Sequence, residues 1–533
     1  MSRAGCRCGR DKTPDSDEDG VVKRWCKRLA YVAAGFVLIL ALALLVERIP
    51  GGWALSNRLT DLARRGERLS LSDLKPKRPT SDQNVFTELL TLTNRVSAVV
   101  SNLDLVSPPS LRLSSPGKAV VLANLDEWSR DGKTTNDWQQ LGSALHAAKE
   151  IIATLESAAQ RPAYDGGVDY DKGFVDFQLQ PIAVIKQSCQ LLSWSALYAL
   201  KQGDLEAAHK DLMALVALVA KQTPEPLVIC QLVRLACAAY AFNTTWQALQ
   251  AGGWSDAQLS SLQSAWQRCD FVNDMAYAME MERAMTLDYY DQIRHSRQKL
   301  AFVIQQHEKT QEMTDGAFGT LPTKGFVLNW LHLPVWRMAW AAQDELASLE
   351  QWQFMIERER LARTNGWAAL AGAPAWPKQH WRLSFDDKEK LGWYNRLRFL
   401  FASENFSISD PLIRKTLEAQ TQQQMTLTAL GIQRYRLKTG RLPSQLSDLV
   451  PGYLAALPRD FMSGKVLLYR LRPAGDGFLL YSVGEDGKDD GGNAAQQDDK
   501  KTYRQIWDGR DGVWPSAATE EEARSAVGTS KHD

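Results

Sequence analysis

Hydrophobic positions recur with a helical period along most of the chain, apart from one uninterrupted apolar run near its beginning. Residues 29–46 read LAYVAAGFVLILALALLV and contain no charged side chain. A run of this length can span the hydrocarbon core of a bilayer, which is about 30 Å thick. Because it is apolar on every face, it is not typical of a helix with one buried face. The pattern predicts a transmembrane helix over 29–47.

Basic residues flank this run mainly on its N-terminal side, where four of them lie, whereas Glu47 and Arg48 follow it. The four are Lys23, Arg24, Lys27 and Arg28. This asymmetry places the tail 1–28 in the cytoplasm and exports the rest of the chain. No small-x-small cleavage site follows the run, which favours an uncleaved signal anchor over a removed signal peptide. We expect a single-pass protein of the bacterial inner membrane with its bulk in the periplasm.

The exported part begins with a predicted linker, 48–84, and continues as a helical domain, 85–410. Gly203 and Asp204 mark a turn between two helices, since glycine ends helices and aspartate caps them. Ser255 and Gln258 have the spacing of a capping box. The predicted helices include 135–159, 183–202, 205–221, 227–251 and 270–300. Successive helical hairpins of this kind indicate an irregular bundle or solenoid-like body.

The pattern changes after Pro411, where one more helix, 412–438, precedes two short apolar runs. These runs, 466–471 and 478–483, are separated by a turn containing Gly-Asp-Gly and predict a β-hairpin. We expect 411–515 to form a small α+β module, with the helix packed across the sheet and a disordered tail at 516–533. Leu427, Leu430 and Leu437 are the helix positions that we expect the sheet to cover, and Tyr469 and Tyr481 should lie in paired strands.

Several motifs follow one another in this module. They are ALGIQRYRLKTGRLP at 429–443, LPRD at 457–460 and YSVGEDGKDDGG at 481–492. In this order they resemble the soluble half of the type II secretion major pseudopilins, over about the last fifth of the chain. That resemblance implies a pilin-like fold for the module.

The chain also departs from the pseudopilin pattern. Pseudopilins carry their membrane helix directly before this region, with a Gly-Phe-Thr-Leu-Ile-Glu processing site, whereas here 35–40 read GFVLIL and lack the glutamate. We therefore do not expect a filament subunit. As a whole the chain resembles a bacterial family of single-pass membrane proteins that combine an N-terminal anchor, a helical body and a pilin-like tail. That resemblance implies an architecture and a location, and no activity.

In pseudopilins the acidic loop of this region binds calcium, and the matching residues here are Asp486, Asp489 and Asp490. Ca²⁺ prefers six to eight oxygen ligands, which clustered carboxylates and the carbonyls of a glycine-rich loop can supply. The alternative is a solvated turn, rich in Asp and Gly because of its backbone conformation. Calcium at this loop is the one cofactor that the sequence suggests.

Paired carboxylates are the other candidate chemistry. Glu280 and Glu282 lie in one predicted helix, and two such groups can serve as general acid and base. Residues two apart point to different sides of a helix, however, so salt bridges are the competing interpretation. The seven histidines are scattered, and no nucleophile or phosphate-loop motif occurs.

Composition excludes some classes of function. The formal net charge is +1, which argues against a globally basic nucleic-acid-binding protein. Seven cysteines in 533 residues do not make a disulfide scaffold. Cys230 and Cys237 lie too far apart on one helix to bond to each other, whereas Cys189 or Cys269 could pair with either in the periplasm, unless all four are buried free thiols.

These observations favour a non-enzymatic role: a membrane-anchored helical scaffold or binding protein in the periplasm, acting through protein contacts in the envelope or in secretion. The alternative is an envelope hydrolase that uses carboxylates such as Glu280 or Glu282 in a cleft of the helical domain.

Overall fold

Helices make up 68% of the computed structural model and strands 7%, as the hydrophobic pattern predicts. The structure describes residues 18–108, 111–129, 134–175, 181–221, 226–313, 332–373, 393–402, 409–473, 477–496 and 505–528. The α-helices are α1 (Glu18–Arg64), α2 (Leu71–Leu74), α3 (Val85–Val106), α4 (Trp138–Ala147), α5 (Lys149–Ala159), α6 (Ala183–Gln202), α7 (Leu205–Lys221), α8 (Val228–Gln250), α9 (Asp256–Trp266), α10 (Phe271–His295), α11 (Arg297–Met313), α12 (Leu333–Val335), α13 (Ala341–Asn365), α14 (Trp393–Arg398), α15 (Ser409–Thr439) and α16 (Glu520–Gly528). The strands are β1 (Leu113–Ser115), β2 (Lys118–Ala119), β3 (Glu127–Trp128), β4 (Asn136–Asp137), β5 (Leu468–Leu471), β6 (Phe478–Ser482), β7 (Gly512–Val513) and β8 (Ser516–Ala517).

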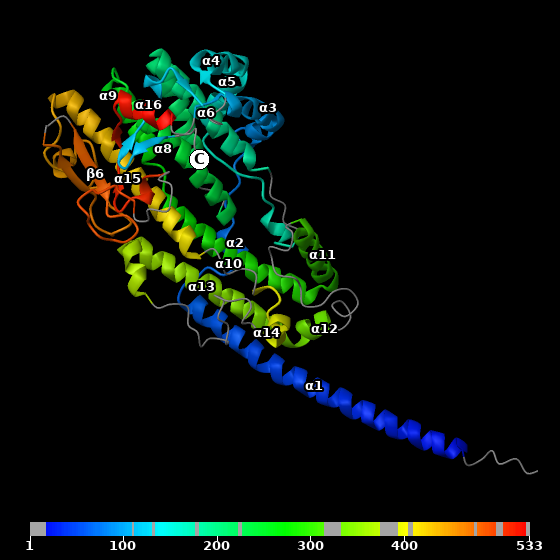
Figure 1. Cartoon of the computed structure of the whole chain (residues 1–533). Coiled ribbons are helices and arrows are strands. Elements are labelled where there is room, and N and C mark those ends of the chain that lie inside the picture. The colour runs from blue at the N-terminus through cyan, green and yellow to red at the C-terminus, as the bar shows by residue number, and fades with distance from the viewer. Residues whose placement is uncertain are drawn as a thin grey trace, which may run out of the picture.

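The apolar run lies in the part of α1 that projects away from the rest of the protein (Figure 1). Its most apolar stretch has a mean hydropathy of 2.8, and none of it is buried in the structure. The helix is long and apolar enough to cross a membrane.

The second half of α1 differs from the prediction. The helix does not end at residue 47 but continues through Pro50 to Arg64, so part of the predicted linker 48–84 is helical. Leu55 and Leu62 are buried in a cluster with Leu346 and Leu349 of α13. Burying these side chains against α13 stabilises the longer helix, and such a contact between distant segments leaves no local pattern in the sequence. The candidate anchor and the body are therefore joined by one continuous helix.

Gly51 and Gly52 are neighbours in α1 with different surroundings. A Cβ atom at Gly51 would lie 2.5 Å from Cγ of the buried Gln343, whereas one at Gly52 would meet nothing within 4 Å. We expect Gly52→Ala to raise the free energy of unfolding by up to about 1 kcal/mol, because alanine favours helix. Gly51→Ala should lower it, since α1 and α13 must move apart. Chemical denaturation in detergent compares the two variants, and equal effects would contradict this account of the α1–α13 contact.

The helical hairpins form as the sequence predicts at α6 and α7, with Gly203 in the left-handed conformation between them. The Ser255–Gln258 capping box at the start of α9 is also present. Two predicted helices are each divided: 135–159 breaks at Ala148 into α4 and α5, and 270–300 breaks at Ser296 into α10 and α11. The break at Ala148 turns α5 onto α3 and α7, while α4 packs on α3 and α6. Packing thus overrides a helical period that continues through the break.

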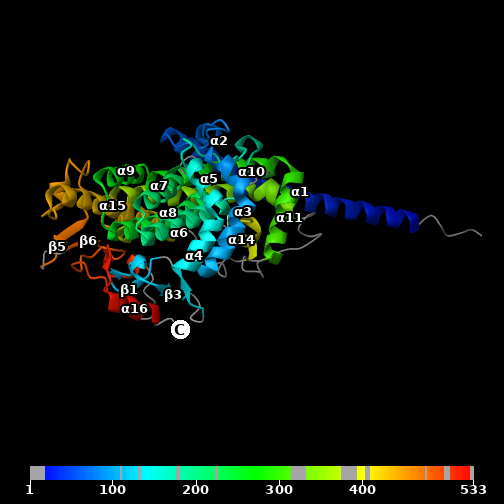
Figure 2. The same cartoon turned by 90° about the horizontal axis from the view of Figure 1, so that it is seen from above.

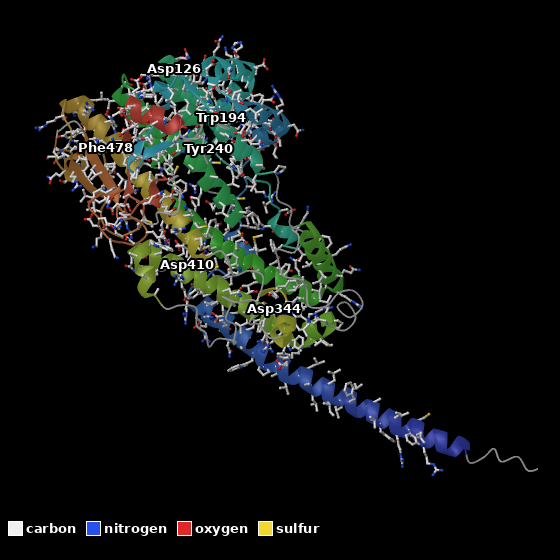
Figure 3. The ribbon with its side chains drawn as sticks, in the orientation of Figure 1. Asp126, Trp194, Tyr240, Asp344, Asp410 and Phe478 are labelled. Atoms are coloured by element: carbon white, nitrogen blue, oxygen red, sulfur yellow. The ribbon has the colours of Figure 1, made fainter. Side chains whose placement is uncertain are left out.

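The predicted hairpin is confirmed. β5 and β6 pair antiparallel, with Leu468 opposite Tyr481 and Tyr469 opposite Leu480, and β7 extends the sheet. Figures 1 and 2 show this sheet at the end of the body opposite to the free end of α1. Phe478, in the same sheet, is labelled there in Figure 3.

The helix of this region is less separate from the body than predicted. α15 packs chiefly against α8, α9 and α10, and it contributes Leu427 and Leu430 to the largest core cluster of the body. Leu437, which we expected under the sheet, is 53% exposed because it lies near the end of α15. The range 411–515 therefore shares a core with the helical domain.

The predicted disordered tail is ordered over 516–528. β8 pairs in parallel with β2, far away in the sequence, and α16 follows it. The Trp246 indole N–H donates to the Pro515 carbonyl at 2.9 Å, which holds the chain against α8 just before β8. Residues 529–533 of the predicted tail lie outside the described residues.

Candidate functional site: the Glu67 charge cluster and the acidic loop

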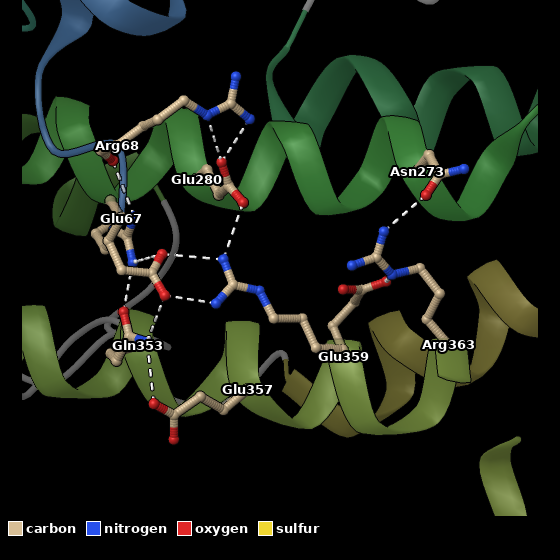
Figure 4. Close-up of polar contacts among 10 residues, drawn as sticks. Glu67, Arg68, Asn273, Glu280, Gln353, Glu357, Glu359 and Arg363 are labelled. Atoms are coloured by element: carbon tan, nitrogen blue, oxygen red, sulfur yellow. Dashed lines mark hydrogen bonds and ion pairs between the residues drawn. The ribbon is translucent and has the colours of Figure 1, made fainter. Parts of the chain in front are cut away.

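Glu280 lies in a cluster of charged side chains between the segment after α1 and the two long helices α10 and α13 (Figure 4). The Glu280 carboxylate accepts hydrogen bonds from Arg68 Nε at 2.9 Å and from Arg360 Nη2 at 3.1 Å. The Glu67 carboxylate accepts from the same Arg360 nitrogen at 2.9 Å and from Arg283 Nη1 at 3.0 Å. We call these five residues the Glu67 cluster.

The Glu67 cluster is a set of fixed charges. Burial opposes the ionisation of Glu67, but the hydrogen bonds from Arg360 and the charge of Arg283 outweigh it and lower the pKa of Glu67 to about 2. The hydrogen bonds that Arg360 donates to Glu67 raise the pKa of Arg360, and burial lowers that of Arg283. Glu67 therefore stays ionised near neutral pH and is not suited to donate a proton. The arrangement fixes the chain after α1 to α10 and α13.

Glu282 points elsewhere. Its carboxylate accepts the N–H of Val228, the first residue of α8, at 3.1 Å. Burial raises the pKa of Glu282 to about 7, while this hydrogen bond acts in the opposite direction. The structure thus places Glu280 and Glu282 in different environments and does not bring them together as an acid pair.

A polar cleft of about 560 Å³ lies between the start of α10 and the end of α13. Its lining includes Asp270, Asn273 and Arg363. Glu359 lies beside Arg363, with Glu359 Oε1 3.4 Å from Arg363 Nε (Figure 4). Burial raises the pKa of Glu359 to about 7. Cys269 also lines the cleft, but burial raises the pKa of its thiol to about 12, which keeps it protonated and a poor nucleophile. No local pattern predicts this cleft, because its lining comes from four separated segments of the chain.

The acidic loop is held by a residue that sequence reasoning missed. Asp511, fully buried, accepts the backbone N–H groups of Gly492 and Asn493 at 2.8 Å each and that of Asp490 at 3.4 Å. Burial raises the pKa of Asp511, and these hydrogen bonds act against the rise. Asp511 thereby closes the loop onto β7.

The predicted calcium ligands make other contacts. Asp489 Oδ1 accepts the Tyr481 hydroxyl at 3.0 Å and the Gly491 N–H at 2.9 Å, while Asp486 Oδ1 accepts the Lys488 N–H at 3.0 Å. Among the described residues, no group of three or more His, Cys, Asp or Glu side chains is placed to hold a metal ion. Asp486 and Asp489 thus hold turns, as expected of the solvated-turn alternative, whereas calcium binding by Asp486, Asp489 and Asp490 stays a prediction of the pseudopilin resemblance.

We expect Asp511→Ala to lower the melting temperature of the full chain, because three partly buried N–H groups lose their acceptor at a total cost of about 2–3 kcal/mol. Asp486→Ala, which removes one exposed contact, is the control and should have a small effect. Millimolar CaCl₂ should leave the melting temperature of the unmodified chain unchanged. A calcium-dependent increase that Asp489→Ala abolishes would contradict this interpretation of the loop.

Two of the quoted motifs contact each other. Asp460, the last residue of LPRD, accepts the hydroxyl of Ser482, which belongs to YSVGEDG, at 2.8 Å. It also accepts the N–H of Met462 at 2.9 Å and the hydroxyl of Ser463 at 2.7 Å. Both motifs thus have a structural role in holding the turn after Asp460 against β6.

No disulfide joins the described cysteines. Cys189 of α6 and Cys237 of α8 are both fully buried and interact with each other, an interaction that raises the pKa of Cys189 together with burial. Cys230 and Cys269 are also buried. Of the two partners considered for Cys237, the structure places Cys189 beside it.

The described residues therefore offer a rigid charge cluster, a polar cleft and a well-supported loop, and they do not bring Glu280 and Glu282 together. No protein-family model matches the chain, and the searches of curated proteins and of solved structures likewise give no match.

Proposed function

We propose that the chain is a single-pass protein of the bacterial inner membrane whose exported body is a scaffold for protein contacts in the envelope or in secretion. The observation that carries this proposal is the continuity of α1. Its apolar run has no buried residue, and the part that follows the run is packed on α13. A helix of this kind joins membrane and body without a flexible linker.

The Glu67 cluster supports the same proposal. It ties the chain directly after α1 to α10 and α13, and Arg283 within it is fully buried. A body held in this way keeps one orientation relative to the membrane. This suits a scaffold that presents a binding surface at a fixed distance from the membrane.

The hydrolase alternative has less support. It requires carboxylates that converge in a cleft, and Glu280 and Glu282 diverge. The Glu280 carboxylate accepts hydrogen bonds from two arginines, and the Glu282 carboxylate accepts the N–H of the first residue of α8.

The far end of the body offers a surface for such contacts. β5 lies at the edge of the β5–β6–β7 sheet, and among the described strands it pairs only with β6. Val466, just before it, is 41% exposed and Leu471, at its end, is 39% exposed. An open edge strand with apolar neighbours can pair with an extended segment of another protein. We propose that the partner of this scaffold supplies such a segment.

Photo-crosslinking in intact cells tests this proposal. A photoreactive amino acid at Val466 or at Leu471 should give an adduct of the same mass, because both positions flank one strand. The matched control is Leu105, which is apolar and 75% exposed but lies at the end of α3. Adducts that are equal at all three positions, or absent from both strand positions, would contradict the proposed contact.

A further inference from the structure

A large groove lies at the base of the body, where α1 leaves it. It has a volume of about 1150 Å³ and is lined by the middle of α1, the junction of α10 and α11, and the region from α12 to the start of α13. Figure 1 shows α11 and α12 close to α1 at this end of the protein. Asp344 lies at this end too (Figure 3) and stiffens it, since its carboxylate accepts the Trp336 indole N–H at 3.0 Å and the Ala402 N–H at 2.9 Å.

The position of the groove along α1 sets its depth relative to a bilayer. The apolar run ends at Val46, and α1 contributes Arg48, Ile49, Gly52 and Trp53 to the groove. At 1.5 Å per residue these four residues lie about 3–10 Å beyond the run. The headgroup layer on one side of a bilayer is about 5–8 Å thick. If α1 spans the membrane, as proposed above, the groove opens at the level of the lipid headgroups.

The polar part of the groove is basic. Among the described residues, Arg48, Arg294, Arg297 and Arg337 line it without an aspartate or glutamate, although Arg294 also pairs with Glu345 of α13, which is not in the lining. The Arg337 guanidinium is held in place because its Nε and Nη2 donate to the Arg294 carbonyl at 3.1 and 2.6 Å. Arginine binds phosphate oxygens with paired hydrogen bonds, so this set of side chains is suited to a phosphodiester.

The remaining lining is largely apolar and includes exposed side chains. Ile49 is 65% exposed, Trp53 70% and Met338 45%. Tryptophan is enriched at membrane interfaces, where its ring lies at the headgroup level. An apolar wall beside a basic rim matches a molecule with an anionic head and a hydrocarbon chain.

We propose that this groove binds one anionic phospholipid of the membrane that holds α1, with the phosphate at the arginines and an acyl chain along Ile49, Trp53 and Met338. Basic pockets beside membrane helices bind anionic headgroups on the cytoplasmic side of a membrane, and the same pairing of arginine with phosphate applies at this groove. The proposal rests on the membrane insertion of α1. Bound lipid would fill the space between α1 and the base of the body and hold the scaffold against the bilayer.

Native mass spectrometry of the full chain in detergent tests the proposal. We expect phosphatidylglycerol to remain bound to the delipidated protein as a one-to-one complex, at concentrations where phosphatidylcholine with the same acyl chains does not. Inorganic phosphate at millimolar concentration should not displace it, because the acyl chain contributes to binding. Equal retention of both lipids, or displacement by phosphate, would overturn the proposal, the second outcome indicating a site for soluble anions.

Two kinds of variant locate the binding. Arg48→Gln combined with Arg297→Gln removes charge from two exposed side chains, and Gly52→Leu fills the groove at a position where an added Cβ meets nothing within 4 Å. Each should weaken phosphatidylglycerol binding at least tenfold. The matched controls are Arg436→Gln combined with Arg441→Gln, at exposed positions far from the groove, and Gly35→Leu, elsewhere in α1.

Binding that is unchanged in both groove variants would overturn the proposal, as would equal losses in the control variants. Because binding is measured in detergent, its failure is distinguishable from a failure of the proposed topology, which reporter fusions measure in cells. Gly52→Leu keeps every arginine, so a folding defect in the arginine variant cannot by itself decide the result.

Discussion

Replacement of Glu67 by alanine is expected to lower the free energy of unfolding of the chain by about 3–5 kcal/mol, measured by chemical denaturation in detergent. Arg283 is fully buried and donates to Glu67 at 3.0 Å, so the substitution leaves a buried positive charge without its carboxylate. Arg360 loses its contact with Glu67 and keeps that with Glu280. The cost arises mainly from these uncompensated charges.

Glu520→Ala is the matched control, since it also removes a glutamate that pairs with an arginine. The side chains of Glu520 and Arg524 are 73% and 76% exposed, and we expect a change below about 1 kcal/mol. A loss at Glu67 no larger than that at Glu520 would show that the Glu67 cluster does not hold α1 to the body.

The same carboxylate should shape the acid side of the stability curve. The pKa of Glu67 is lowered to about 2 in the folded chain, from about 4.5 when unfolded. Its contribution is therefore fully present above about pH 4.5 and is lost as the pH falls towards 2. In Glu67→Gln this part of the pH dependence should disappear, which denaturation at pH 3 and pH 6 measures. An unchanged pH 3 to pH 6 difference would contradict the assignment.

Gly464→Ala is expected to destabilise the chain by more than about 3 kcal/mol. Gly464 has a φ of +77°, and a Cβ there would lie 2.2 Å from the carbonyl oxygen of Asn365, at the end of α13. The left-handed conformation costs alanine about 1–2 kcal/mol, and the backbone overlap adds to that cost. These two segments of the chain cannot separate easily, because backbone hydrogen bonds join them. Trp367 N–H donates to the Phe461 carbonyl at 3.0 Å and Ala368 N–H to the Met462 carbonyl at 3.0 Å.

Gly440→Ala separates these two costs. Gly440 has a φ of +73°, but an added Cβ would meet nothing within 4 Å. We expect only the conformational cost of about 1–2 kcal/mol there. If thermal or chemical unfolding gives equal losses for Gly440→Ala and Gly464→Ala, the close contact between α13 and the turn after Asp460 does not contribute to stability.

Local signals in the sequence were sufficient for much of the fold. Gly203 between α6 and α7, the Ser255–Gln258 capping box and the two apolar runs that form β5 and β6 each act within a few residues. They therefore predict the element that contains them. The breaks at Ala148 and Ser296 carry no glycine or proline, and packing against other helices decides them.

Contacts between distant residues were the part that could not be predicted. Glu67 and Arg360 are 293 positions apart, and Glu67 lies in what the sequence suggests is a linker. Asp511 is 19 positions from Gly492 and lies outside the acidic motif at 481–492 that predicts the loop. The parallel pairing of β8 with β2 orders a tail that is polar in sequence. In each case the partner, and not the local pattern, determines the role of the residue.

The topology of the chain is the central claim of this account, and reporter fusions in living cells measure it most directly. The fusion site is residue 528, after α16, so that β8 and α16 stay intact. An enzyme that is active only after export should be active at this site, an enzyme that is active only in the cytoplasm should be inactive, and the mature chain should keep residues 1–28. Cytoplasmic activity at residue 528, or a mature N-terminus near residue 47, would contradict the claim.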